Sequence, residues 1–409
     1  MNNTTQPPAS TVLVHSLIFL FPFLLLITHF GTGLCNFAFL VAALITWRRG
    51  WPALVRHLTE IRGVLIAFGA VLLLALLFAL CSGDGRLRDL EKPLRNLLAA
   101  SVMLTVLACR PSRKALWWGL IAGALAGAVF IAYQRWGIGL DRPGGLINSI
   151  TFGDIMLCMG LMCLAATLDF AGRQAIWPAL GALAGLAGSV ATGTRGGWIA
   201  IGFSILLFAR YGHLLRGRWR KALALLALAL VVSTYFIPQT GARERIDEGF
   251  SDVHHYFNGG ETYTSVGIRL ELWRSALQLI GRHPLLGASI PTVRTEMEQL
   301  VAERRAHPYV LEFEHFHNDI LQALVFGGVL GLLAWGATLL VPFLFFMRQM
   351  REGAGGRNAP ALAGLLLVLS YFSFGLTEVI FWSMRSNMFY TMMLFLLAGL
   401  CLNAKDEPA

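Results

Sequence analysis

Charged side chains are scarce in this sequence. Asp, Glu, Lys and Arg make up 14% of its 409 residues, hydrophobic residues make up 56%, and the mean hydropathy is +0.63. A soluble protein of this size needs more charge to cover its surface, so this composition excludes an ordinary soluble enzyme. Apolar runs such as 64–80, 116–132 and 222–237 approach or reach the length that crosses ~30 Å of hydrocarbon as a helix. The sequence therefore predicts an all-α polytopic membrane protein.

Several signatures of metal and cofactor binding are missing as well. The six cysteines form no C-x-x-C pair and no zinc-like spacing, so we expect buried free thiols. No Asp-x-Asp pair stands where a divalent cation would be held against phosphate, and no Gly-rich phosphate loop occurs at a strand–helix junction. No internal repeat is visible either. We therefore expect no cofactor.

The first apolar segment and the net charge each have a simple explanation. The run at 12–28 has no basic n-region and no small-residue cleavage site, so we expect a retained helix and no signal peptide. The formal net charge is +10, but the basic residues lie largely in short loops between apolar runs. Membrane topology explains that placement better than nucleic-acid binding does.

Loop charge predicts the sidedness of the spans. The basic segments "WRRGWPALVRHLTEIR", "RPSRK", "RYGHLLRGRWRK" and "RQMREGAGGR" all follow even-numbered spans. Lys and Arg in short loops mark the cytoplasmic side, so we expect both termini to be cytoplasmic and the odd-numbered loops to face outward. Twelve spans are predicted, at about 12–29, 33–47, 62–81, 94–109, 115–134, 151–168, 176–193, 196–210, 221–237, 317–347, 359–377 and 386–402.

One outward loop is much larger than the others. It covers residues 238–316 and divides the chain into spans one to nine (1–237), the loop itself, and spans ten to twelve with a short tail (317–409). Within it, "VGIRLELWRSALQLIGRHPLLG" has the spacing of an amphipathic helix, which we interpret as lying on the outer membrane–water interface. The apolar positions of this helix are Ile268, Leu272, Trp273, Ala276, Leu277 and Ile280.

Some arginines are not explained by topology. Arg195 lies in the Gly-rich external turn "ATGTRGGWIA", Arg142 leads into the sixth span, and Arg269 begins the amphipathic loop helix. A guanidinium beside the membrane is costly unless an anion meets it, and its planar fork suits phosphate. Snorkelling to lipid headgroups or a local ion pair is the alternative. These arginines are candidates for binding a pyrophosphate in place of a metal ion.

The segment "EFEHFHND" at 312–319 combines histidines and acids at the start of the tenth span. In extended conformation His315 and His317 share one face, while Glu312 and Glu314 point to the other. A zinc site needs three or four converging donors, so this pattern favours no metal. A wet, polar helix entry without chemistry remains an alternative. We favour His317 as an acid–base group, because an imidazole suits proton transfer at neutral pH.

Other polar residues near the outer ends of the spans are candidates for supporting roles. Asn318 and Asp319 are poor orienters of His317, since neighbours at i+1 and i+2 do not share a helical face. Asp154 and Glu378 also lie near outer helix ends. The possible supporting residues are Asn318, His315, Asp319 and Glu378.

Three segments resemble a known family. "TGTRGGWIA" is similar to an S/T-R-G-G/S element, and "IRLELWRSALQLIGRHPLLGAS" is similar to an "R…W..A…I..HPLLG.G" segment. "HNDILQALVFGGVLG" fits His-Asn, nine residues, Gly, two residues, Gly, at His317, Asn318, Gly328 and Gly331. Together, over about residues 140–400, they resemble the O-antigen ligase (WaaL) family of bacterial inner membranes, within a wider ligase/polymerase superfamily. "HPLLGAS" departs from the pattern, which commonly continues with Gly.

The resemblance implies a GT-C-like fold and metal-independent, inverting glycosyl transfer at the periplasmic face of a Gram-negative inner membrane. The implied donor is an O-antigen glycan on undecaprenyl pyrophosphate, and the implied acceptor is a sugar hydroxyl of lipid A–core. Carried over by motif, Arg195 and Arg269 would bind the pyrophosphate and His317 would be the general base. Arg142 is our own extension of the pyrophosphate site. The implied partners are these two lipid-anchored glycans and membrane lipids, with no nucleic acid.

Other functions stay open on sequence alone. An O-antigen polymerase or a protein O-oligosaccharyltransferase would use a similar site, and the His-Asn-x9-Gly-x2-Gly pattern favours the ligase over the polymerase. A transporter or flippase is less favoured, because transporters tend to place charges at the midplane on broken helices and often in repeated halves. Here the candidate groups cluster at one face.

Overall fold

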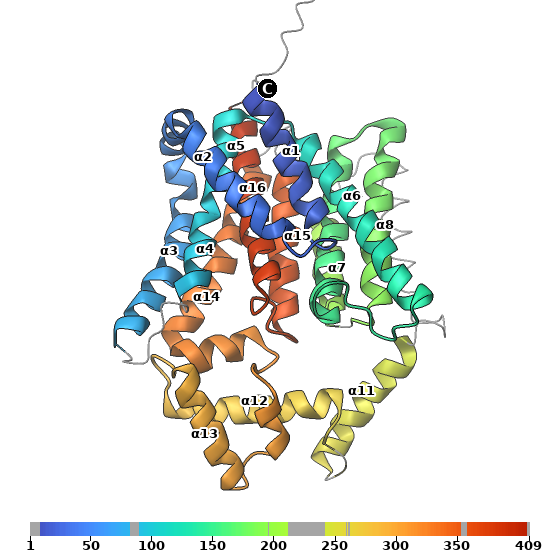
Figure 1. Ribbon diagram of the computed structural model, residues 1–409, viewed down its shortest axis with the longest axis vertical. Helices are drawn as coiled ribbons and strands as arrows, with labels where there is room; N and C mark the ends of the chain where they lie inside the picture. The colour runs from blue at the N-terminus through green and yellow to red at the C-terminus, as the bar shows by residue number, and fades with distance from the viewer. Residues whose placement is uncertain are drawn as a thin grey trace, which may run out of the picture.

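The architecture is known from a computed structural model that describes residues 9–81, 90–194, 196–211, 242–258, 260, 262–352 and 358–406 (Figure 1). Over these residues the chain is helical and contains no strand. Long helices run side by side in a bundle, and three further helices lie across one end of it (Figure 1). The predicted all-α polytopic fold is therefore confirmed.

The bundle helices correspond to the predicted spans. Within the described residues, nine candidate spans are long and apolar enough to cross a membrane, and two further apolar helices are shorter. Together they match eleven of the twelve predicted spans, and one of these, Glu91–Cys109, consists of two consecutive helices, α4 and α5. The predicted ninth span, 221–237, lies outside the described residues. The helices are α1 (Ala9–Leu24), α2 (Gly31–Arg56), α3 (Leu58–Cys81), α4 (Glu91–Leu98), α5 (Ala100–Cys109), α6 (Arg113–Ala132), α7 (Ser149–Ala166), α8 (Ile176–Ala191), α9 (Trp198–Tyr211), α14 (Asp319–Glu352), α15 (Asn358–Gly375) and α16 (Met384–Lys405).

Three helices form the centre of the bundle. Nearly every side chain of α7, α15 and α16 is buried, as expected for helices that are apolar on all sides. Glycines allow α7 and α8 to pack closely, because a Cβ at Gly185 would lie 2.6 Å from the Cα of Gly160. By contrast, α3 and α14 are largely exposed on the outside of the bundle and would face lipid. The site described below is built on the ends of the central helices.

The helical segments extend further than their apolar runs. The basic segment expected as a loop between the second and third spans is almost entirely helical, since α2 ends at Arg56 and α3 begins at Leu58. Only His57 separates them, with a non-helical ψ of 6°. A span prediction follows hydropathy, whereas a helix continues wherever its backbone hydrogen bonds are satisfied, so charged residues can extend it into the interface.

The layer beyond the bundle has its own hydrophobic core. The layer consists of α11 (Ala242–Phe257), α12 (Ser265–Arg282), α13 (Ile290–Ala302) and the short 3₁₀ helix η7 (Pro308–Glu312). Leu272, Ala276 and Leu279 of α12 are buried against residues of α13, η7 and the start of α14. The expectation that this apolar face lies on the membrane interface is therefore wrong, because the face packs on protein. Of the predicted apolar positions, Leu277 remains exposed.

A break in α14 connects this layer to the bundle. Gly328 interrupts the helix with φ 59° and ψ −157°, a conformation that only glycine adopts readily. The "HPLLG" turn packs on the break: Val329 N donates to Pro284 O at 2.9 Å, and Ala288 N donates to Val325 O at 2.9 Å. Beyond the break, α14 continues for about 36 Å at 1.5 Å per residue, enough to cross the bilayer. The first turns of α14 therefore belong to the outer layer.

We expect Gly328→Ala to destabilise the protein by about 2–4 kcal/mol. A Cβ at this position would collide with the backbone of Leu285, and the left-handed φ would be strained. Thermal unfolding in detergent measures the loss. Gly327→Ala is the matched control, because a Cβ there meets nothing within 4 Å. Equal unfolding temperatures for the two variants would contradict the assigned role of the break.

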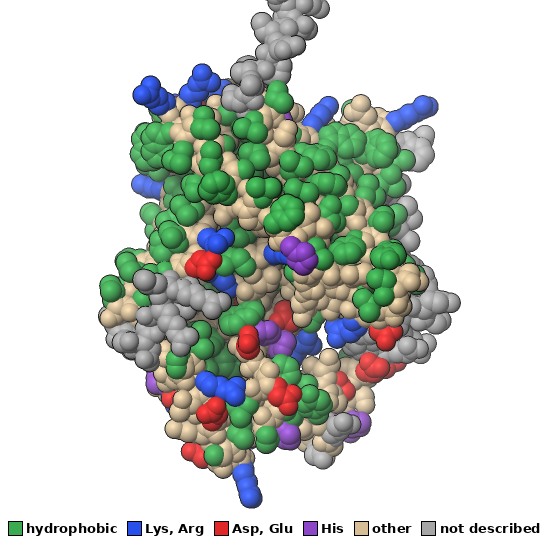
Figure 2. All heavy atoms as spheres, in the orientation of Figure 1, with side chains coloured by type: hydrophobic (Ala, Val, Ile, Leu, Met, Phe, Trp, Pro, Cys, Tyr) green, Lys and Arg blue, Asp and Glu red, His purple; other side chains and the backbone are tan. Residues whose placement is uncertain are grey.

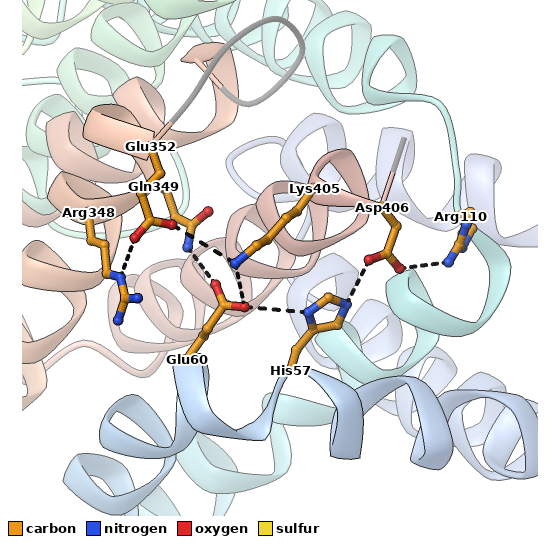
Figure 3. Close-up of polar contacts among 8 residues, drawn as sticks. All are labelled: His57, Glu60, Arg110, Arg348, Gln349, Glu352, Lys405 and Asp406. Carbon is orange, nitrogen blue, oxygen red and sulfur yellow. Dashed lines mark hydrogen bonds and ion pairs between the residues drawn. The ribbon is translucent and has the colours of Figure 1, made fainter. Parts of the chain in front are cut away.

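A polar network ties helices together at the opposite end of the bundle (Figure 3). Lys405 Nζ of α16 lies 2.8 Å from Glu60 Oε1 of α3, and Arg110 Nη2 lies 2.8 Å from Asp406 Oδ2. His57, at the α2–α3 turn, lies between Glu60 and Asp406 at 3.8 and 3.5 Å. The remaining members, drawn in the same view, are Arg348, Gln349 and Glu352 at the end of α14.

Candidate active site

The centre of the candidate site is a histidine–carboxylate pair at the end of the bundle that faces α12. His317 Nδ1 lies 3.0 Å from Glu378 Oε2 and 3.1 Å from Oε1. An ionised carboxylate only accepts, so in the neutral ring of His317 Nδ1 carries the hydrogen and Nε2 keeps a free lone pair. Glu378 comes from the α15–α16 loop, 61 residues further along the chain. The arrangement can hold an imidazole ready to accept a proton at Nε2.

The charge state of Glu378 follows from its surroundings. Burial raises the pKa of this carboxyl, but the hydrogen bond from His317 and the charges of His317 and His315 outweigh burial, so the pKa lies below its ordinary value. Glu378 is therefore ionised at neutral pH. An ionised partner fixes the tautomer of His317 and favours the imidazolium that forms when Nε2 accepts a proton.

The pH dependence of stability should report this pair. A lowered carboxyl pKa stabilises the folded state above the unfolded value of about 4.5, and the contribution is lost as the pH falls through the lower folded-state value. We expect Glu378→Gln to lower stability at pH 7 by about 1–2 kcal/mol, and the difference from the wild type to shrink below about pH 4.5. Thermal unfolding of both proteins across this range measures it.

The control for this comparison is Glu298→Gln, whose carboxylate is exposed and paired with Arg294 on the surface of α13. An exposed pair contributes little, so this variant should match the wild type throughout. A pH-independent effect of Glu378→Gln would contradict the assigned charge.

The backbone around His317 is held in an unusual conformation. His317 has φ 49°, in the left-handed region that non-glycine residues rarely adopt. The next residue, Asn318, caps α14: its Oδ1 accepts from Ile320 N at 2.9 Å and from Leu321 N at 3.0 Å. Its Nδ2 donates to Leu376 O at 3.0 Å. Asn318 therefore ties the His317 segment to the loop that carries Glu378, which is a positioning role.

The Glu378 loop is also held from a second side. Asp319 is buried beside this loop, and the backbone of Ile380 and Phe381 interacts electrostatically with its carboxyl group. Lys92 Nζ of α4 donates to the carbonyls of Phe381 and Trp382, both at 3.0 Å. These contacts fix the loop that presents Glu378. Sequence reasoning missed Lys92, although it is a basic residue at the outer end of a span, the same criterion that selected Arg142.

Helix α12 supplies both an anchor and a charge. Trp273 Nε1 donates to Phe316 O at 3.0 Å, which fixes the residue next to His317. Arg269 lies four residues before Trp273, so the two share a face of α12. Burial lowers the pKa of Arg269 and the charge of exposed Arg142 lowers it further, while the carboxylates of Glu378 and Asp154 oppose this shift. An arginine stays charged under such conditions. The structure thus brings Arg142, Asp154 and Glu378 within electrostatic range of Arg269.

Arg195 lies outside the described residues, but residues on both sides of it are described. Thr194 Oγ1 donates to Ser149 O at 3.1 Å. A Cβ at Gly197 would lie 2.6 Å from Asp154 Oδ1, and one at Gly196 would collide with the Thr377 side chain. These two glycines therefore allow the turn to pack directly against α7 and the Glu378 loop.

His315, the other histidine of "EFEHFHND", lies beside the His317–Glu378 pair. The rings of His315 and His317 contact each other with centroids 4.4 Å apart, which confirms that they share one face. Glu312 points elsewhere and accepts from Tyr263 Oη at 3.2 Å. Burial lowers the pKa of His315, against an opposing effect of Glu378. Its Nδ1 lies 3.7 Å from Glu378 Oε1.

These contacts change the picture of possible metal donors. Within residues 312–319, His315 and His317 belong to a group of possible metal ligands, and the third member comes from outside this segment. With Glu378 added, one ligand atom each from His315, His317 and Glu378 lie within 4.8 Å of one another, a group able to hold a metal ion. Glu378 was a candidate supporting residue in the sequence, but its proximity to the histidines arises from tertiary packing, 61 residues along the chain.

Fold and site together define a polytopic membrane protein that gathers a histidine–glutamate pair and arginines at one end of its bundle. The sequence model of the O-antigen ligase family matches residues 180–336, a range that contains Arg195, Arg269 and His317. This match supports membership of the chain in the O-antigen ligase family. The chain is also similar to an uncharacterized protein of Haemophilus influenzae, with 22% identity over 325 residues, which cover 77% of this chain and 80% of that one.

Proposed function

We propose that this protein is an O-antigen ligase, which transfers a glycan from undecaprenyl pyrophosphate to a sugar hydroxyl of lipid A–core. Membership in the family supports ligase- or polymerase-type transfer, and the His-Asn-x9-Gly-x2-Gly pattern favours the ligase. The observation that carries the proposal is the His317–Glu378 pair, which leaves Nε2 of His317 free to accept a proton. Glu378 lies within electrostatic range of Arg269, at the end of the bundle that faces α12. In the topology proposed below, both lipid-anchored substrates can reach this end from the membrane surface.

The chemistry needs one base and a cationic clamp. The acceptor hydroxyl oxygen attacks the anomeric carbon, its proton passes to Nε2 of His317, and the bond to the pyrophosphate oxygen breaks with inversion. The pyrophosphate leaves with the electron pair, and the proposed ligands Arg195, Arg269 and Arg142 stabilise its charge. Glu378 balances the imidazolium that forms. Asn318 and Asp319 lie between the His317 segment and the loop that carries Glu378, so they position the pair without touching the substrate.

The proposed location follows from charge. The outermost side chains at the upper end of the molecule in Figure 2 are Lys and Arg, whereas Asp, Glu and His appear mainly in the lower half. Because basic loops stay in the cytoplasm, we place the upper end and both termini there, and α11–α13 with His317 in the periplasm of a Gram-negative bacterium. On this basis the chain divides into spans one to nine (1–237), a periplasmic loop (238–316) and spans ten to twelve (317–409).

Transfer should not require a metal ion. Arginines serve the pyrophosphate in this proposal, so we expect EDTA to leave the transfer rate of the purified protein unchanged or higher. The assay should include a metal-dependent glycosyltransferase as a control that EDTA does inactivate. Loss of activity on chelation, with recovery on adding a divalent ion, would establish a catalytic metal.

The decisive experiment offers three acceptors in parallel. The reconstituted protein is given the lipid-linked glycan donor together with lipid A–core, a second lipid-linked glycan, or a protein acceptor. Transfer to lipid A–core supports the ligase. Transfer to the second glycan would instead identify a polymerase, and transfer to protein an O-oligosaccharyltransferase. Movement of the intact lipid-linked glycan across the bilayer without any transfer would identify a flippase.

A further inference from the structure

We propose that His315, His317 and Glu378 form an inhibitory binding site for a divalent transition metal such as Zn²⁺. The inhibitory part of this inference rests on the proposed function, whereas the binding part does not. His315 has no role in the proposed transfer mechanism. Its Nδ1 is buried and has no hydrogen-bond partner, yet it lies 3.7 Å from Glu378 Oε1.

The spacing of the donor atoms suits a tetrahedral ion. Bonds of about 2.0–2.1 Å from zinc to nitrogen or oxygen place neighbouring ligand atoms about 3.3 Å apart. Glu378 has an oxygen 3.0 Å from His317 Nδ1 and another 3.7 Å from His315 Nδ1. Small side-chain adjustments would therefore complete three corners of a tetrahedron. The histidine side chains are 21% and 17% exposed, so an ion could enter and keep a water in the fourth position.

The donor types select the class of metal. Two imidazoles and one carboxylate suit Zn²⁺ and its first-row neighbours, whereas Mg²⁺ and Ca²⁺ prefer oxygen ligands. The positive charge of Arg269 near Glu378 disfavours any cation. The favourable free energy of metal binding must therefore come from metal–nitrogen bonds, which Mg²⁺ and Ca²⁺ form poorly.

Metal binding would remove the base by a tautomer change. In the pair, His317 carries its hydrogen on Nδ1 and accepts at Nε2. A metal bound at Nδ1 takes the Nδ1 lone pair, so the single hydrogen of the neutral ring moves to Nε2. The ring then has no lone pair for the acceptor hydroxyl, and Glu378 is bound to the metal. No proton is released in this exchange, and transfer stops until the metal leaves.

The test uses the full-length protein in detergent or nanodiscs, freed of metal by chelation. Titration with Zn²⁺ is followed by calorimetry, and Co²⁺ serves as a spectroscopic probe of tetrahedral coordination. We expect one tight site in the wild type and at least about tenfold weaker binding in His315→Ala. His283→Ala is the matched control, because His283 is also paired with a glutamate, Glu296, at 2.8 Å. This control should bind like the wild type.

The transfer assay then measures inhibition, with each variant compared with its own metal-free rate. Zn²⁺ should inhibit the wild type and EDTA should reverse the inhibition, while His315→Ala should need at least about tenfold more Zn²⁺. His315→Asn replaces His315→Ala if the latter fails to fold. Equal zinc binding by wild type and both His315 variants would overturn the proposal, as would zinc inhibition that neither variant relieves. Tight, His315-dependent binding in a protein without any transfer activity would support the site and count against the proposed function.

Discussion

Replacing His317 by alanine should lower the rate of glycan transfer by about 10²- to 10⁴-fold, the range that a positioned general base contributes. The reason is specific to the geometry: Glu378 holds Nδ1 at 3.0 Å, so Nε2 is the nitrogen free to take the acceptor proton. Initial rates with purified lipid-linked glycan and lipid A–core measure the effect. The loss should appear in the rate at saturating substrate, because His317 acts on the reacting hydroxyl.

The control for this variant is again the second histidine–glutamate pair of the outer layer. His283→Ala removes a histidine that lies 2.8 Å from Glu296 but is distant in sequence from His317 and outside the proposed chemistry. Expression, membrane insertion and unfolding temperature are compared in parallel, so that a folding defect is separated from a chemical one. Full activity of well-folded His317→Ala would remove His317 from the mechanism.

The second large effect is expected at Arg269. Arg269→Ala should lower transfer by about 10²- to 10³-fold, the cost of removing one donor that stabilises developing charge. Arg269→Lys should restore only part of the rate, since lysine keeps the charge but loses the planar fork that suits phosphate. Initial rates at varied donor concentration separate kcat from KM for both variants.

Arg274 on the same helix provides the matched control. Its side chain is 64% exposed and its contact with Glu271 is long, 3.9 Å, so Arg274→Lys should leave transfer unchanged. By the family resemblance Arg195 also binds the pyrophosphate, so Arg195→Lys should severely impair transfer, since lysine keeps the charge but loses the planar fork. Wild-type kcat and KM in Arg269→Lys would exclude the proposed clamp at that position.

The sequence predicted the bundle well because its signal is strong. Long apolar runs have one stable arrangement in a membrane, and eleven of the predicted spans correspond to described helices. His315 and His317 do lie together as predicted, but the extended conformation assumed for them is wrong at His317, which has φ 49°. In each case the signal lies in neighbouring residues.

What the sequence could not give depends on distant partners. Glu378 was selected only as a polar residue near a helix end, and tertiary packing alone brings it to His317 Nδ1. The amphipathic pattern of α12 predicted that one of its faces is buried, but not by what. This face packs on α13, η7 and the start of α14, and not on lipid as predicted. Gly328 matched a motif, but its role in breaking α14 follows only from its backbone angles and its contact with the "HPLLG" turn.

The polar network at the far end of the bundle has a practical consequence for making the protein. Lys405 pairs with Glu60 of α3, and Asp406 pairs with Arg110, the residue that follows α5. A truncation before residue 405 would remove these two ion pairs and loosen the end of α16, one of the three central helices of the bundle. An affinity tag or fluorescent fusion should therefore leave residues 405 and 406 intact and be joined through a flexible linker, so that both side chains stay in place.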